Sequence, residues 1–123
     1  MITYELAKKL KKAGFPQDMC QWYFVNKNEI RVKKWAYPYD GSVFTPDKKS
    51  IAIPTLSELI EACGDKIQGL AKIRDEETIN SLKDEINAIC DIGDWMAVAT
   101  DEVTLGIDES MEEAVANLWL KIK

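Results

Sequence analysis

Six acidic residues stand close together in the sequence between positions 91 and 109. They are Asp91, Asp94, Asp101, Glu102, Asp108 and Glu109. Carboxylate oxygens are the ligands that Mg²⁺ and Ca²⁺ prefer, and a close pair of carboxylates can act as the acid and base of a glycosidase. A start at Asp91 does not match an EF-hand, because Gly93 and Trp95 then occupy the third and fifth positions. The sequence therefore favours solvated turn residues, and we expect no metal site, no cofactor and no catalytic pair.

Histidine is absent from the chain, and this narrows the chemistry that the chain can perform. It excludes the Ser-His-Asp triad, the Cys-His dyad and zinc sites with imidazole ligands. Cys20, Cys63 and Cys90 form no C-x-x-C pair, and their odd number suits a reducing compartment. The scattered glycines form no phosphate-binding loop. We therefore expect three small buried cysteines and no enzymatic activity.

The N-terminal half carries a second set of candidates, in which basic side chains are mixed with aromatic ones. The basic residues are Lys8, Lys9, Lys11, Lys12, Lys27, Arg31, Lys33 and Lys34, and the aromatic residues are Trp22, Tyr23, Phe24, Trp35, Tyr37 and Tyr39. Single-stranded nucleic acid binds such surfaces, because cations contact its phosphates and rings stack on its bases. The candidate nucleic-acid contacts are Lys8, Lys12, Arg31 and Lys33. In the alternative interpretation, Trp22 or Phe24 packs in the core and the lysines keep the surface soluble.

Aromatic residues are also the candidates for contact with another protein. Trp35, Tyr37 and Tyr39 lie at the end of a predicted hairpin and in a proline-containing loop, and Trp119 lies on the predicted C-terminal helix. Exposed aromatic rings frequently anchor protein interfaces. We predict that the protein acts by binding a protein partner or a second copy of itself, with nucleic-acid binding as the alternative. The competing interpretation of these rings is packing beneath the loop.

Charge is distributed unevenly along the 123-residue chain, whose formal net charge is −5. Residues 1–50 contain ten Lys and Arg and five Asp and Glu, a net of +5, whereas residues 51–123 have a net of −10. An acidic protein is a poor general binder of nucleic acid, so such binding requires a local basic patch. The same asymmetry is compatible with head-to-tail self-association or with ordinary solvated faces.

Length and composition are typical of one globular domain that spans residues 1–123. The chain has 46% hydrophobic and 30% charged residues, close to the average for such domains. No apolar run approaches the ~18 residues of a transmembrane helix, and the N-terminus lacks the apolar core of a signal peptide. We expect a cytoplasmic protein without membrane partners.

Apolar spacing and capping residues predict four helices. Their ranges are 4–13, 55–63, 76–90 and 111–122. Thr55 with Glu58, and Ser110 with Glu113, have the spacing of capping boxes. Thr3 can cap the first helix. In the third helix, an apolar stripe of Ile79, Leu82, Ile86 and Ile89 is expected.

Alternating and β-branched residues predict the strands. Their ranges are 21–25, 29–35, 51–53, 67–73 and 95–100, with a further short piece at 103–105. The alternation in 29–35 predicts one buried and one wet face. Most neighbouring strands lack a crossover helix, so antiparallel pairing is expected. The predicted fold is α+β, with a small, mainly antiparallel sheet of three to five strands packed with N-terminal, central and C-terminal helices.

Two segments, PTLSELIEACGD at 54–65 and EEAVANLWLKIK at 112–123, resemble blocks in small uncharacterised proteins of tailed phages and prophages. In that group a TLSELIEACG-like helix precedes an aromatic strand similar to DWMAVA at 94–99, and a capped helix follows. More distantly, the chain resembles the phage alpha-beta-alpha sandwich domain. The resemblance implies a phage or prophage accessory protein and no particular reaction. The chain departs from the pattern at 71–93, which is longer and more helical.

Overall fold

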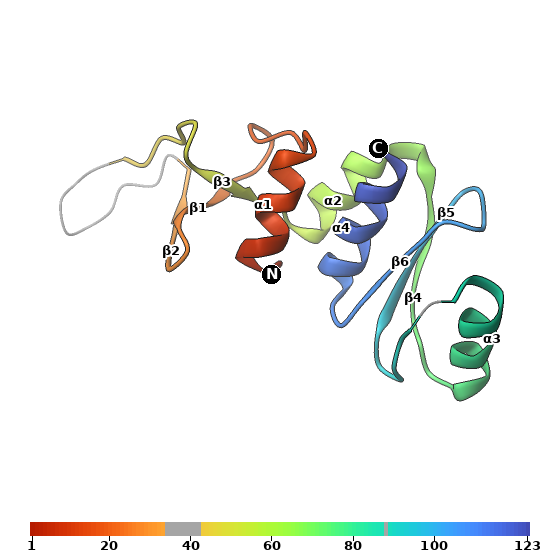
Figure 1. The fold of residues 1–123 in the computed structure, drawn as a ribbon. Coiled ribbons are helices and arrows are strands. Elements are labelled where there is room, and N and C mark those ends of the chain that lie inside the picture. Colours follow the sequence, from red (N-terminus) through yellow and green to blue (C-terminus); the bar gives the residue numbers. More distant parts are fainter. Residues whose placement is uncertain (34–42, 88) are drawn as a thin grey trace. The chain divides into compact units, whose positions relative to one another are not determined.

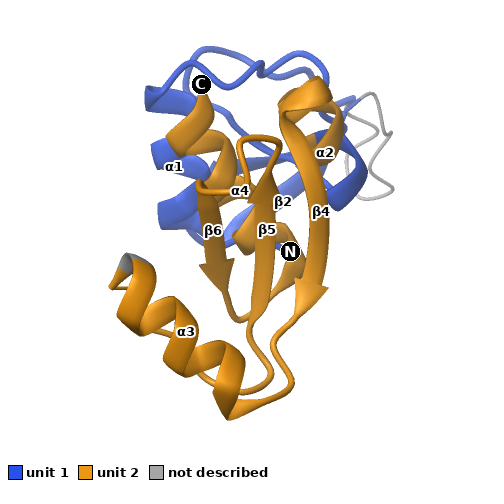
Figure 2. Ribbon diagram, turned by 90° about the vertical axis from the view of Figure 1, so that its right-hand side faces the viewer, with its two compact units in different colours: residues 1–58 blue, residues 59–123 orange. Residues whose placement is uncertain are grey.

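The computed structural model describes residues 1–33, 43–87 and 89–123 (Figure 1). Contacts within the chain divide it into two compact units, residues 1–58 and residues 59–123 (Figure 2). This division by contacts does not show whether the units fold separately, so the single domain predicted for residues 1–123 stays a prediction. Chains of this size commonly unfold as one cooperative domain. Each unit is described in turn.

The first helix of the N-terminal unit, α1 (Tyr4–Lys12), begins at the predicted residue and ends one residue before the predicted end, with Ala13 as its C-cap. The Thr3 hydroxyl oxygen accepts a hydrogen bond from the Leu6 N–H at 3.2 Å, which caps the helix. Gly14 follows with a φ of +95°, a left-handed conformation that glycine adopts without a steric penalty. One face of α1 is buried and consists of Leu6, Ala7 and Leu10. The lysines of α1 therefore occupy the remaining surface.

Three strands form the sheet of the N-terminal unit, in the order β2-β1-β3 and antiparallel throughout. They are β1 (Trp22–Asn26), β2 (Glu29–Val32) and β3 (Ile51–Ile53). The predicted hairpin of β1 and β2 is confirmed. The predicted buried face of the second hairpin strand is wrong over β2, because β2 is an edge strand in which Ile30 is 37% exposed and no residue is fully buried.

The middle strand β1 is instead buried on both faces. Phe24 lies against α1, where its ring meets the Tyr4 ring edge-on at 5.1 Å between centroids. Tyr23 points to the opposite face, where the Phe44 ring centroid lies 5.9 Å away. Neighbouring residues of a strand point to opposite faces, so both rings are buried only because separate segments of the chain cover the two faces.

The second sheet belongs to the C-terminal unit and has the order β4-β5-β6, again antiparallel. Its strands are β4 (Ile67–Lys72), β5 (Trp95–Ala99) and β6 (Leu105–Asp108). The helices that accompany it are α2 (Leu56–Cys63), α3 (Glu76–Ile86) and α4 (Met111–Ile122), with a short 3₁₀ turn at Gly64–Lys66. Within the described ranges, four α-helices and two three-stranded sheets confirm the α+β class. The division of the strands between two sheets is not predicted by the sequence.

The helix α4 packs on β5 and β6 at very close range (Figure 2). Ala97 and Gly106 are paired across the two strands, and Ala97 is fully buried. A Cβ atom added at Gly106 would collide with the backbone of Ala114 and Leu118 in α4. Small residues in the strands therefore allow the helix backbone to approach the sheet.

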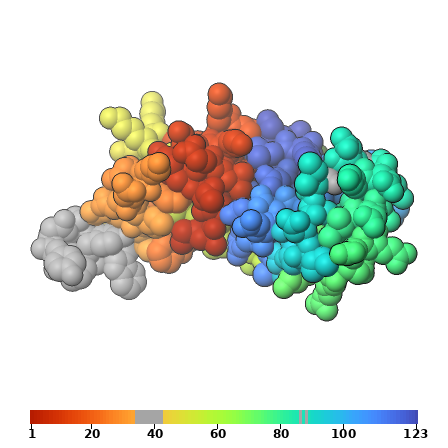
Figure 3. Space-filling view, turned by 60° about the horizontal axis from the view of Figure 1, so that its bottom comes forward, coloured from red at the N-terminus to blue at the C-terminus, as the bar shows by residue number. Residues whose placement is uncertain are grey.

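The helix α3 is shorter than predicted and is little buried. It ends at Ile86, because Asn87 adopts a left-handed conformation with a φ of +56°. Ile89, which is predicted to belong to the apolar stripe of this helix, lies beyond its end and is 94% exposed. Ile79 and Leu82 are half-buried. Figure 3 shows this green segment at the molecular surface.

The two predicted capping boxes have different outcomes. At α2 the box is confirmed, because the Thr55 N–H donates to the Glu58 carboxylate at 2.8 Å and the Glu58 N–H donates to the Thr55 hydroxyl at 3.3 Å. At α4 the Glu113 N–H donates to the Ser110 hydroxyl at 3.2 Å. The Glu113 carboxyl, however, is engaged with Asp108, so the returning bond of the second predicted box is replaced.

Among the described residues, no helix is long and apolar enough to cross a membrane.

Candidate nucleic-acid interface

A groove of about 550 Å³ lies along α1, and most of its lining residues are lysines. We call it the lysine groove. It is lined by Glu5, Lys8, Lys9, Lys11, Lys12, Lys49 and Ile51. Residues three and four apart share a helix face, so Lys8 projects beside both Lys11 and Lys12. Figure 3 shows α1 (red) at the molecular surface beside the hairpin (orange).

Lys11 connects α1 to a turn that is distant in the sequence. Its Nζ donates to the carbonyl oxygens of Lys48 at 2.5 Å and of Ser50 at 2.7 Å. These bonds occupy the ammonium group of Lys11 and hold residues 48–50 beside the helix. Lys11 is therefore a positioning residue of the groove.

The turn itself is organised by Asp47. One carboxylate oxygen of Asp47 accepts the backbone N–H groups of Lys49 at 2.8 Å and of Ser50 at 3.0 Å. These bonds stabilise the ionised carboxylate and lower the pKa of Asp47. Lys49 lines the lysine groove, whereas Lys48 lines a neighbouring pocket.

Most lysines of the groove have no anionic partner. In the part of the chain that the structure describes, the one ion pair joins Arg31 to Glu29 at 3.2 Å. Lys8, Lys9, Lys12 and Lys49 thus have no carboxylate within 4.0 Å among the described residues. Such a concentration of uncompensated charge raises the local positive potential and attracts anions.

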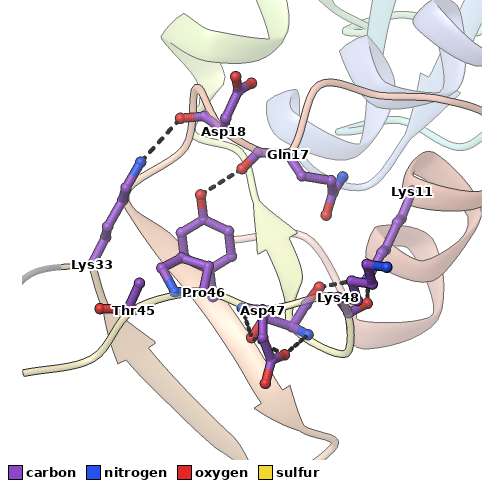
Figure 4. Close-up of a pocket in the computed structure, with 10 residues that line it drawn as sticks. Lys11, Gln17, Asp18, Lys33, Thr45, Pro46, Asp47 and Lys48 are labelled. Carbon is purple, nitrogen blue, oxygen red and sulfur yellow. Dashed lines mark hydrogen bonds between the residues drawn. The ribbon is translucent and has the colours of Figure 1, made fainter.

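A second cavity, of about 480 Å³, adjoins the lysine groove and shares Lys11 with it. We call it the tyrosine pocket (Figure 4). It is lined by Lys11, Gln17, Asp18, Tyr23, Lys33, Thr45, Pro46, Asp47, Lys48 and Ser50. The Tyr23 hydroxyl donates to the Gln17 carbonyl oxygen at 2.5 Å, and the ring is only 1% exposed, so Tyr23 lies beneath the pocket and offers it little ring surface. Burial is the main cause that raises the pKa of Tyr23 to about 12, so the hydroxyl stays protonated.

The four residues predicted to contact nucleic acid occupy different environments. Lys8 and Lys12 lie together in the lysine groove, and Lys33 lines the tyrosine pocket. The Lys33 Nζ donates to the Asp18 carbonyl oxygen at 3.3 Å. Arg31 lines neither cavity and pairs with Glu29. The structure therefore brings two of the four residues together.

Lys48 and Lys49 are absent from the sequence-based candidates, although both line these cavities. The aspartate at 47 followed by a serine at 50 is a usable sign of a local turn. That sign does not reveal that the turn packs beside α1, because the contact with Lys11 joins residues 37 to 39 positions apart.

The residues predicted to form a protein interface receive little support. Trp35, Tyr37 and Tyr39 lie outside the described residues. Trp119 is 8% exposed, so the expectation of an exposed ring on the C-terminal helix is wrong. The reason is that Trp119 lies on the side of α4 that also buries Val115 and Leu118.

The three cysteines are free and buried, as predicted. Burial is the main cause that raises the pKa of the Cys20 thiol to about 12, and burial likewise raises the pKa of the Cys63 and Cys90 thiols. Because the thiolate is the nucleophile and the metal ligand, thiols held protonated are poorly reactive.

Acidic residues of the C-terminal unit organise turns. The Asp101 carboxylate accepts the N–H groups of Val103 and Thr104, both at 2.8 Å. The Asp94 carboxylate accepts the Asp91 N–H at 2.9 Å. Across the described ranges, no group of three or more Cys, Asp or Glu residues is arranged to hold a metal ion.

Comparisons of the chain with protein-family models, with curated proteins and with solved structures find no match. The function must therefore be argued from the surface itself.

Proposed function

We propose that the protein binds nucleic acid through the lysine groove, as a binding module without enzymatic activity. The single observation that carries this proposal is the set of four lysines, Lys8, Lys9, Lys12 and Lys49, that share one groove without a carboxylate partner among the described residues. Nucleic acid presents a regular row of phosphates, and lysines that contact them release condensed counterions.

The distribution of charge between the two units favours a local site. Residues 1–58 contain ten basic and six acidic residues, a net of +4, whereas residues 59–123 contain six basic and fifteen acidic residues, a net of −9. Phosphates are repelled by the C-terminal unit and attracted by the lysine groove. Nucleic acid can therefore bind at the lysine groove although the protein as a whole is acidic.

A purely structural role explains part of the lysine cluster. Lys9, Lys11 and Lys12 lie in the last turn of α1, where cations stabilise the negative end of the helix dipole. Lys49 lies in the separate turn at residues 47–50 and belongs to no helix, so the dipole of its own segment does not explain its charge. Lys49 lines the same groove as the α1 lysines. Compensation of the helix dipole therefore does not explain the whole lysine cluster, and binding of an external anion is favoured.

The proposed setting is the bacterial cytoplasm, in a phage or prophage accessory role. The resemblance of segments 54–65 and 112–123 to tailed-phage proteins supports that context. Three free, buried thiols suit a reducing compartment.

The test is the binding of a fluorescein-labelled single-stranded oligonucleotide, followed by fluorescence anisotropy. The double variant Lys8→Gln/Lys12→Gln is expected to bind at least about tenfold more weakly at low salt, because two phosphate contacts are lost. The affinity of the unmodified protein should fall steeply between about 50 and 200 mM salt, and the double variant should have a shallower slope, by roughly 0.7 per lost contact.

The matched control is Lys72→Gln/Lys83→Gln, which removes two exposed lysines from the C-terminal unit. This control should bind as the unmodified protein does. An affinity that is independent of salt, or equal losses in both double variants, contradicts the proposal. Equal affinity for poly-glutamate of the same length also contradicts it, because an acidic protein would then be the better candidate ligand.

Association with a protein is the second candidate, and the C-terminal sheet favours it. Figure 2 shows α4 behind the three strands, while their other face is turned toward the viewer. The register places Met96, Val98 and Ile107 on that face, where each is half-exposed. Val98→Lys should then convert an associating protein into a monomer in sedimentation experiments, whereas a monomeric unmodified protein would contradict this candidate.

A further inference from the structure

The two edges of the C-terminal sheet differ in the backbone groups that they leave unpaired. Figure 2 shows β4 and β6 at the two margins of this sheet, with β5 between them. The Ala99 N–H donates to the Thr104 carbonyl oxygen at 3.0 Å. Because hydrogen-bonded pairs alternate along an antiparallel ladder, the register then directs the backbone groups of Leu105 and Ile107 away from β5. These groups form the outer edge of β6.

Helix α4 covers the outer edge of β6. The Lys121 Nζ donates to the Leu105 carbonyl oxygen at 2.6 Å. The Asn117 side-chain amide donates to the Ile107 carbonyl oxygen at 3.4 Å. Edge strands commonly carry such protection, because a row of free N–H and C=O groups pairs readily with other strands. A further strand could pair with β6 only after both side chains had moved.

The outer edge of β4 has no such cover among the described residues. The Ile73 N–H donates to the Asp94 carbonyl oxygen at 2.7 Å. By the same alternation, the backbone N–H and C=O groups of Leu70 and Lys72 point away from β5, and within the described ranges they have no hydrogen-bond partner. Leu70 is half-buried, whereas Ala71 and Lys72 are exposed. The edge of β4 therefore offers donors and acceptors in the alternating pattern that an added strand requires.

The charge of this edge restricts the partner. The segment 66–74 contains Lys66, Lys72 and Arg74 and no acidic residue, whereas the rest of residues 59–123 contains three basic and fifteen acidic residues. A second copy paired through β4 would bring two basic strands together, whereas a strand with carboxylates would form cross-strand pairs of opposite charge. Exposed charges more than about 10 Å apart are largely screened at 0.1 M salt, so the local basic strand decides the preference.

We propose that the outer edge of β4 binds an extended, acidic segment of a partner protein, which adds a fourth strand to the C-terminal sheet. Main-chain hydrogen bonds to Leu70 and Lys72 supply the pairing, and carboxylates beside Lys66 and Lys72 select the partner. This surface belongs to the C-terminal unit. The inference is therefore independent of nucleic-acid binding through the lysine groove.

The experiment joins a probe strand to the full chain. The Lys66 Nζ donates to the Ile122 carbonyl oxygen at 3.4 Å, so the end of α4 lies beside the start of β4. A Gly-Ser linker of about ten residues after Lys123 would hold the probe near β4 at an effective concentration on the order of millimolar. The probe has about seven alternating valine and glutamate residues, enough for one strand. The matched control probe has lysine in place of glutamate.

The readout is hydrogen exchange of single amides, measured by NMR. In the unmodified protein, the Leu70 and Lys72 amides should exchange faster than the Ala71 amide, which points to β5. The glutamate probe is expected to slow exchange at Leu70 and Lys72 by at least about tenfold, because each net hydrogen bond stabilises the pairing. The lysine probe should have an effect about threefold smaller or less, because its charges face those of the strand.

Variants of the edge test the pairing and its charge preference separately. Lys72→Glu should reverse the preference and favour the lysine probe. Lys83→Glu makes the same change of charge at an exposed position of α3 and should leave the preference for glutamate intact. Leu70→Pro removes one outward N–H at an edge position, where proline is tolerated, and should weaken the pairing of both probes. If Leu70→Pro folds poorly, the comparison of Lys72→Glu with Lys83→Glu still tests the proposal.

Several results would overturn the proposal. With the glutamate probe attached, unchanged exchange at Leu70 and Lys72 refutes strand addition at β4, and slower exchange at Leu105 and Ile107 instead assigns the binding edge to β6. Equal protection by the two probes refutes an acidic partner. Protection of the β4 edge in the unmodified protein that increases with protein concentration identifies a second copy as the occupant. Each of these results leaves nucleic-acid binding by the lysine groove unaffected.

Discussion

Gly106 is a residue of the C-terminal unit at which no side chain fits without movement of the backbone. A Cβ atom there would meet the Ala114 carbonyl oxygen and would lie 3.0 Å from the Leu118 Cα, so helix α4 itself would have to move. Gly106→Ala is therefore expected to lower the free energy of unfolding by about 1–3 kcal/mol or more, measured by urea denaturation.

Gly69 is the matched control for this substitution. It also lies in a strand of the same sheet, but an added Cβ atom would meet no atom within 4 Å. Gly69→Ala should change the free energy of unfolding by less than about 0.5 kcal/mol. Equal effects of the two substitutions would show that the close approach of α4 does not limit stability.

Glu113 makes stability depend on pH. Burial, and then a hydrogen bond and charge repulsion from Asp108, raise the pKa of Glu113 from 4.5 to about 7. Between these pH values the native protein retains a proton that the unfolded chain has lost, so the contribution of Glu113 to the free energy of unfolding falls as pH rises.

Replacement of Glu113 by glutamine should remove this contribution. We expect E113Q to be more stable than the unmodified protein at pH 8, by on the order of 1 kcal/mol after allowance for solvent screening. Near pH 4.5 the difference should be much smaller. Urea denaturation at several pH values measures it, and parallel profiles for the two proteins would refute the assignment.

At the scale of elements, α3 and α4 illustrate how similar helical patterns acquire different stability. Both begin with a side-chain cap, from Asp75 to the Thr78 N–H at 2.8 Å and from Ser110 to the Glu113 N–H at 3.2 Å. The helix α4 buries a continuous apolar side, whereas no described side chain of α3 is fully buried. Packing therefore stabilises α4 much more than α3.

Hydrogen exchange should report this difference. Amides of α3 are expected to exchange faster than those of α4, because α3 can open locally without disrupting the core. Asp75→Ala should accelerate exchange in α3 roughly fivefold, the equivalent of about 1 kcal/mol, with little change in global unfolding. Ser110→Ala should instead lower global stability by a similar amount. Amides of α3 that are protected as strongly as those of α4 would contradict this ranking.

At the scale of the whole molecule, the two compact units share one helix. The boundary between residues 58 and 59 falls inside α2, whose capping residues Thr55 and Glu58 lie in one unit and whose buried Leu59 and Cys63 lie in the other. Unfolding either unit by itself would remove part of this helix.

We therefore expect a single cooperative unfolding transition. Hydrogen-exchange mass spectrometry at increasing urea can follow β1 in the N-terminal unit and β5 in the C-terminal unit separately. Their transitions should coincide, and Gly106→Ala should shift both to lower urea concentration. Separate midpoints, or a shift confined to β5, would show that the units unfold independently and would refute the single domain.

Much of the local structure is predictable because it depends on neighbouring residues. The Thr3 cap and the Thr55–Glu58 box use atoms three residues apart, and both are found where the spacing indicates. The end of α3 is less predictable, since Asn87 can either continue a helix or end it in a left-handed conformation. The apolar spacing that includes Ile89 predicts that the helix continues, whereas in the structure the helix ends at Ile86 and Asn87 is left-handed.

The candidate site is predictable only in part, for the same reason. The α1 lysines follow from the helical pattern, and their exposure follows from the buried stripe on the other face. The addition of Lys49 depends on the bonds from Lys11 to a turn nearly forty residues away. No local pattern encodes such a contact.

Taken by itself, the amino-acid sequence determines the types of elements, most of their ends, the absence of histidine chemistry and the uneven charge, because these depend on composition or on residues within one helical turn. Only the tertiary structure decides that the strands divide between two sheets, that Tyr23 and Phe24 are both buried, and that lysines from α1 and from the turn at 47–50 line one groove. Those features arise from contacts between distant segments, whose pairing is selected by the packing of the folded chain as a whole.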